Sequence, residues 1–207
     1  MGRVMTVGTD PGTFFYVLDE EVQILFADDD PILQEFALVH LSTSSAKVKT
    51  ASDGFQALRK LEESPYDLLL LDLEMPNMDG FQVLEKLRSD ERFKRLPVII
   101  VTGREDVAAI DRAFQAGATS FVVKPINWRL LSYQIRFVHR AAQTERSLEQ
   151  ARARARTEAV HAAQTVKRLA QQGAEFMDLA TEREPGLRAL AGDYAELLSR
   201  LRPQRAA

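Results

Sequence analysis

Short apolar runs alternate with amphipathic segments along the first two thirds of the chain. The runs predict strands over residues 22–27, 46–51, 68–71, 96–101 and 120–123. Between them, apolar positions at steps of three and four predict helices over residues 31–41, 54–61, 80–87 and 103–117. Strands that alternate with helices over roughly 110 residues indicate a parallel sheet with helices on both faces.

The run Leu68–Leu71 is the centre of this pattern. Four consecutive leucines leave no polar alternation, which is typical of a strand buried on both faces. Asp72 follows at the carboxyl end of the strand, where open α/β sheets bind their ligands. The alternative for a single aspartate is a turn-forming role.

Other predicted strands also end in polar residues. The first runs into Asp28-Asp29-Asp30-Pro31, where capping of the next helix needs only one carboxylate, and a bound cation would relieve the repulsion among three. Right-handed crossovers place all carboxyl ends at one edge of the sheet. The side chains predicted to converge there are those of Asp28, Asp29, Asp72, Thr102 and Lys124.

These residue types suit the transfer of a phosphoryl group. Aspartate oxygens are hard ligands that suit Mg²⁺, and Asp72 is a plausible carboxylate nucleophile. Lys124 would neutralise and position phosphoryl oxygens, and the Thr102 hydroxyl could donate a hydrogen bond to one of them. Positioning and charge stabilisation are what phosphoryl transfer mainly requires.

Four stretches in this order resemble the receiver domain of bacterial two-component response regulators. They are Leu25–Pro31, Leu71–Gly80, Val101–Gly103 and Val123–Pro125. The resemblance implies a doubly wound, five-stranded parallel sheet of the flavodoxin-like kind over residues 21–140. It also implies that Asp72 accepts a phosphoryl group from a histidine kinase or a phosphotransfer protein.

The resemblance further assigns a role to each site residue. Asp29 and Asp72 would bind Mg²⁺, with Asp28 acting partly through water and the Glu74 backbone carbonyl completing the ligands. Thr102 would be the switch hydroxyl, and Lys124 would pair with the phosphate. Phe121 would be the switch aromatic, although an ordinary core aromatic at the sheet edge is the alternative. No catalytic residue is expected, and we do not expect an enzyme.

The chain beyond Asn127 predicts helix only. A run of about 45 residues without Gly or Pro carries a coiled-coil stripe rich in alanine, and a solvated helix that merely looks periodic is the alternative. The stripe consists of Leu131, Val138, Ala141, Leu148, Ala155, Ala159, Ala162, Val166, Leu169, Gly173, Phe176 and Ala180, and Glu145 and Arg152 interrupt it.

Glu184-Pro185-Gly186 should break this helix, and Leu187, Leu190, Tyr194, Leu197 and Leu201 predict a second one. Such a hairpin would pair with a copy of itself as a four-helix bundle. It is faintly similar to the dimerisation and phosphotransfer hairpin of sensor kinases, with Thr181-Glu182-Arg183 where the histidine would stand. We therefore expect an extension over residues 1–20, a receiver over 21–140 and a helical dimerisation region over 141–207.

The charge and the amino-acid composition of the chain limit the classes of partner that we expect. The net charge of −3 favours neither nucleic acid nor membrane, and the chain has no cysteine for disulfides or thiolate chemistry. The basic faces of the long helix lack interleaved aromatics, so nucleic acid is an unlikely partner. His139 and His161 have no ligand-spaced partners and are expected at the surface.

We therefore expect a cytoplasmic response regulator that signals through its C-terminal helices and has no recognisable DNA-binding or enzymatic output. The alternative is a regulatory or remnant subunit of a sensor kinase that binds a kinase. A nucleic-acid binder that uses the basic helix is a third class.

Overall fold

The computed structural model describes residues 18, 20–103, 107–184, 186 and 188–200. Most of the predicted extension over residues 1–20 lies outside this set, as do the predicted helix start at residues 104–106, Pro185 in the predicted break, and Leu187 and Leu201 of the second helix. Contacts divide the chain into two compact units, Met1–Glu145 and Arg146–Ala207. The predicted boundaries at residues 20 and 140 stay predictions.

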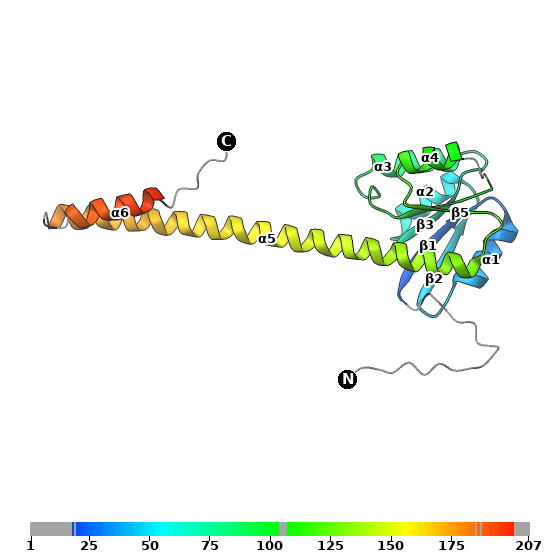
Figure 1. The fold of residues 1–207 in the computed structure, drawn as a ribbon, viewed down its shortest axis with the longest axis horizontal. Helices are drawn as coiled ribbons and strands as arrows, with labels where there is room; N and C mark the ends of the chain where they lie inside the picture. Colours follow the sequence, from blue (N-terminus) through cyan, green and yellow to red (C-terminus); the bar gives the residue numbers. More distant parts are fainter. Residues whose placement is uncertain (1–17, 19, 104–106, 185, 187, 201–207) are drawn as a thin grey trace, which may run out of the picture. The chain divides into compact units, whose positions relative to one another are not determined.

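The first unit contains a five-stranded parallel sheet in the order β2-β1-β3-β4-β5, which confirms the predicted fold class (Figure 1). The strands are β1 (Val22–Ala27), β2 (Ala46–Ala51), β3 (Leu68–Asp72), β4 (Val98–Thr102) and β5 (Ser120–Val123). The helices between them are α1 (Pro31–Leu41), α2 (Gly54–Glu63), α3 (Gly80–Ser89) and α4 (Val107–Gln115). The next helix, α5 (Trp128–Arg183), follows β5.

The leucine run of β3 supplies both faces of the sheet. Leu69 and Leu71 belong to the core beneath α2, α3 and α4, whereas Leu68 and Leu70 belong to the core beneath α1 and α5. All five residues of β3 are buried. Alternate side chains of a strand point to opposite faces, so a sheet covered on both sides needs an apolar residue at every position.

The start of α5 closes the second of these cores. Leu131, Ile135 and Val138 lie at helical spacing and pack against the sheet beside α1. The side-chain oxygen of Asn127 accepts a hydrogen bond from the Leu130 N–H at 3.1 Å, as expected of the predicted cap. The helix is 56 residues long, and the predicted long helix after the sheet is therefore confirmed.

The second unit consists of the rest of α5 and of α6 (Arg188–Arg200). Figure 1 shows α6 lying along the last part of α5. The two helices are in close contact at Gly173, where an added Cβ would lie 2.7 Å from the Cζ atom of Tyr194. Glycine therefore allows the tyrosine ring to rest on the backbone of α5.

Candidate functional site

Lys124 joins the ends of three strands. Its Nζ lies 2.8 Å from Asp28 Oδ2 and 2.7 Å from Asp72 Oδ2. Asp28 follows β1 and Asp72 ends β3, and both carboxylates are buried. The structure thus brings together three charged groups that are far apart in the sequence.

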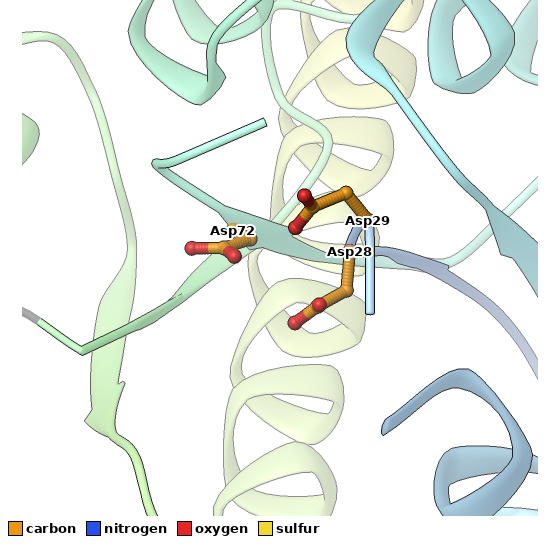
Figure 2. A group of neighbouring side chains, drawn as sticks. All are labelled: Asp28, Asp29 and Asp72. Carbon is orange, nitrogen blue, oxygen red and sulfur yellow. The ribbon is translucent and has the colours of Figure 1, made fainter. Parts of the chain in front are cut away.

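Asp29 completes a group of three carboxylates at the same edge of the sheet. Figure 2 shows Asp28 and Asp29 beside Asp72, with their carboxylates gathered at the strand ends. One oxygen from each of the three residues lies within 4.8 Å of the others. Asp29 is exposed, so the group is open to solvent on that side.

The third aspartate of the run, Asp30, caps α1 instead of joining the site. Its side chain accepts a hydrogen bond from the Ile32 N–H at 2.8 Å, and its own N–H donates to Asp28 Oδ1 at 3.0 Å. The Gln34 amide donates to the Asp28 carbonyl at 2.7 Å. Capping therefore uses one carboxylate, and the first turn of α1 fixes the position of Asp28.

Thr102 and Phe121 lie on the other side of Asp72. Thr102 ends β4 and is fully buried, and its carbonyl accepts a hydrogen bond from the Lys124 N–H at 2.9 Å. Phe121 is 36% exposed and meets Phe114 of α4 edge-on, with ring centroids 6.0 Å apart. Gly103, next to Thr102, has open space where a side chain would be.

The charges of Asp72 and Lys124 depend on each other. Burial raises the pKa of the Asp72 carboxyl, and the hydrogen bonds from Lys124 and the Glu74 N–H offset only part of this rise. Burial lowers the pKa of Lys124, but its hydrogen bonds to Asp28 and Asp72 outweigh this effect, so the net direction is upward. The lysine is therefore held charged beside a carboxylate of increased basicity.

The residues at this edge fit a divalent cation. Three carboxyl groups and one ammonium group lie here, so acidic groups outnumber basic ones at this edge. Apart from its ion pair with Lys124, the buried Asp28 Oδ2 accepts no hydrogen bond within the part of the chain that the structure describes. Oxygen ligands of this kind are those that Mg²⁺ prefers.

The prediction for His139 was wrong. This side chain is 2% exposed, and its Nδ1 lies 3.7 Å from a carboxylate oxygen of Glu20. His139 follows Ile135 by four residues, so it lies on the face of α5 that covers the sheet. Arg136, expected on an exposed basic face, is half-buried, whereas His161 is exposed as predicted.

Sequence reasoning missed two side chains that hold the site. Gln34 binds the Asp28 carbonyl, and no motif marks it. Gln82 forms a reciprocal capping box with Asp79 at the start of α3, just after the strand that carries Asp72. The spacing of Asp79 and Gln82 is a recognised helix-start signal and could have revealed this second contact.

Among the helices of the described residues, none combines the length and apolar character that a membrane span needs.

The family profile described as "Response regulator receiver domain" matches residues 24–136. Among curated proteins, the heme response regulator HssR of Staphylococcus aureus (strain JH9) is 36% identical over 119 residues, which cover 58% of this chain and 52% of HssR. The chain thus matches about half the length of this relative.

Solved structures agree with the sequence match. A CheY-like response regulator receiver domain protein from Methanospirillum hungatei JF-1 is 27% identical with a TM-score of 0.57, and the match covers 61% of this chain and 99% of that one. The signal receiver domain of a signal transduction histidine kinase from Syntrophus aciditrophicus is 26% identical with a TM-score of 0.54, over 58% and 91% of the two chains.

Proposed function

The chain belongs to the response regulator receiver family, and on this premise we propose that Asp72 accepts a phosphoryl group from a histidine kinase or a phosphotransfer protein. A carboxylate oxygen of Asp72 forms the new bond to phosphorus as the bond from phosphorus to the donor imidazole nitrogen breaks. The ion pairs of Lys124 with Asp28 and Asp72 are the observation that carries this proposal.

The other residues have supporting roles. Lys124 is close enough to Asp72 to pair with an oxygen of the incoming phosphoryl group, and Thr102 offers a hydroxyl from the neighbouring strand. Asp28, Asp29, Asp72 and the Glu74 carbonyl would hold Mg²⁺. When bound, Mg²⁺ supplies positive charge that offsets the negative charge of the phosphoryl oxygens. Phe121 is positioned to change its packing against Phe114 as a switch.

Labelling with acetyl phosphate and Mg²⁺ tests the acceptor. The unaltered chain should gain the mass of one phosphoryl group, and Asp72→Asn should not, because an amide oxygen is a poor nucleophile. Asp111→Asn, at an exposed position of α4, is the matched control and should label normally. Undiminished labelling of Asp72→Asn would refute the assignment.

The output would be protein–protein interaction through α5 and α6, including a homodimer. The exposed apolar side chains of both helices support this part of the proposal. Light scattering of the full chain, with and without a phosphoryl mimic, tests it. A monomer in both states would rule the homodimer out.

A second candidate is a subunit that binds a sensor kinase. This candidate is supported by the structural similarity of the chain to the receiver domain of a histidine kinase. In that case the full chain should capture a histidine kinase in a pull-down, and deletion of residues 146–207 should abolish the capture. Capture that survives this deletion would place the kinase contact on the receiver alone.

A further inference from the structure

The contact between α5 and α6 uses small or half-buried side chains along one stripe of each helix. On α5 these are Ala170, Gly173, Ala174 and Met177, and on α6 they are Ala191 and Tyr194. Residues three, four and seven apart share a helix face, so the two stripes are continuous. This contact joins the helices into a hairpin without using their largest apolar side chains.

Leu179 of α5 is 61% exposed and lies farther around the helix, away from this contact. Four other large apolar side chains lie beside the contact and also face solvent. They are Leu169 (58% exposed), Phe176 (69%), Leu190 (59%) and Leu197 (59%), which we call the open face. Each of these four residues comes one position before a residue of the contact stripe, or before a position that continues the stripe. One residue corresponds to a rotation of about 100° around the helix axis, so all four are displaced from the stripe in the same sense. Because α5 and α6 run antiparallel, equal rotations of this sense bring both pairs to the same side of the hairpin.

The opposite side of the hairpin is polar on α5. Gln171 and Asp178 lie there, one residue after positions of the contact stripe, and both are exposed. On α5, therefore, the two sides that flank the contact differ, one being apolar and the other polar. A solvated hairpin would need no such division.

An apolar stripe also runs along α5 on the N-terminal side of the open face, where α6 does not reach. Leu148, Ala155, Ala159, Ala162 and Val166 follow at coiled-coil spacing, and every side chain over residues 151–169 is exposed. Val166 and Leu169 stand at successive core positions of the repeat. Within a parallel coiled coil, a β-branched residue followed by leucine in this way favours two strands over three or four.

The exposed apolar area of these helices fits a second copy of the chain better than it fits a small partner. The four side chains of the open face expose roughly 100 Å² each, or about 400 Å² per copy. A stable dimer buries about 800 Å² per partner, so the open face alone supplies half of that area. The remainder must come from residues 148–166, and a second copy presents both segments in the same order.

We propose that two copies of this chain associate in parallel through the open face, as a four-helix bundle that continues into a two-stranded coiled coil to Leu148. The association is isologous, so each open face meets its own counterpart about a two-fold axis. The inference rests on the proposed function, because it specifies the homodimer of that proposal.

Light scattering of the full chain with a charge in the open face tests the surface. The unaltered chain should be a dimer, and Phe176→Glu should shift it to monomer, with the dimer dissociation constant raised at least tenfold. Gln171→Glu adds the same charge to the opposite side of α5 and should leave the dimer intact. Equal helix content of the two variants by circular dichroism would show that the hairpin still folds.

Cysteine cross-linking tests the orientation, because the chain has no native cysteine. Under oxidation by copper phenanthroline, Leu148→Cys and Leu169→Cys should each form a disulfide with the same residue of the second copy. Gln171→Cys should not. An antiparallel dimer would leave Leu148→Cys uncoupled and overturn the parallel arrangement.

The outcomes separate this inference from the rest of the proposed function. A dimer that Phe176→Glu leaves unchanged would overturn the open face while keeping a homodimer through another surface. A monomeric unaltered chain would overturn both the open face and the homodimer. Acetyl phosphate labelling of Asp72 in the same samples reports on the acceptor independently of either result.

Discussion

Lys124 is shared by two buried carboxylates, and this sharing determines the electrostatics of the site. Asp28 is fully buried and Asp72 is 3% exposed, so neither charge is well solvated. A single ammonium group within 2.8 Å of both offsets their desolvation and their mutual repulsion. Lys124, a residue from another strand, therefore favours the ionised form of the acceptor and offsets part of the rise in its pKa that burial causes.

Replacing this lysine should raise the pKa of Asp72 further. Lys124→Met removes the hydrogen bond and the charge that lower the pKa of Asp72, and leaves burial and the charge of Asp28, which raise it. The protonated acid would then persist to higher pH than in the unaltered chain. Carbon-13 NMR titration of the Asp72 carboxyl without Mg²⁺ measures this shift.

Lys86→Met is the control for that titration, because Lys86 is exposed on α3. This substitution should leave unchanged the pH at which the Asp72 carboxyl titrates. An Asp72 that titrates at the same or lower pH in Lys124→Met would contradict the shared-lysine account.

Residues at strand ends could be placed from the sequence, whereas residues placed by tertiary packing could not. Asp28, Asp72 and Lys124 each follow an apolar run, and parallel topology alone brings such ends together. The spacing of His139 from Ile135 places it on the buried face of α5, but its residue type gives no sign of burial, because its cover comes from the sheet and from Glu20. Gln34 was missed for a similar reason, since its partner is a backbone carbonyl.

Among the elements, α3 is pressed closely against the end of β3. The Gly80 N–H donates to the Leu73 carbonyl at 3.1 Å. An added Cβ at Gly80 would lie 2.9 Å from the Leu73 Cα atom and would overlap the Asp72 carbonyl oxygen. Because these neighbours are backbone atoms, they cannot rotate away as a side chain would.

Gly80→Ala should therefore destabilise the receiver. Overpacking of this kind costs about 1–3 kcal/mol, and urea denaturation followed by circular dichroism measures it. Gly103→Ala is the control, since no atom lies within 4 Å of its added Cβ. Equal midpoints for the two variants would show that α3 can shift to accept the methyl group.

Element boundaries were less predictable than the elements themselves. The apolar pattern starts the fourth strand at Leu96, but β4 begins at Val98. The pairing of β4 with β3 begins at Leu69 and Val98, and Pro97 has no N–H to extend the ladder. The boundary at Val98 is therefore set by Pro97 and by the pairing with β3, and the apolar pattern alone does not mark it.

At the scale of the whole molecule, the two units differ in how they are stabilised. The receiver has a core on each face of its sheet. From residue 146 onward, no side chain that the structure describes is buried. A long helix that buries so little gains little from tertiary packing, which usually contributes more to helix stability than propensity does. In the proposed dimer, association would supply this packing.

The thermal stability of the C-terminal helices should therefore depend on the concentration of the chain. Association with the folded form shifts the unfolding midpoint upward by mass action. Circular dichroism melts over a dilution series should show an α-helical transition that moves to higher temperature as the concentration rises. The transition of the receiver, followed by the fluorescence of Trp128, should stay constant, and two concentration-independent transitions would argue against association.

The tight contact between Gly80 and the end of β3 makes the two flanks of Asp72 mechanically unequal. On one flank, the backbone at Asp72 packs closely against α3, and Asp28 accepts hydrogen bonds from Gln34 and Asp30. On the other flank, Gly103 borders free space. The backbone on the first side cannot shift to make room for a group added to Asp72. We therefore expect such a group to displace residues of β4 and β5 instead.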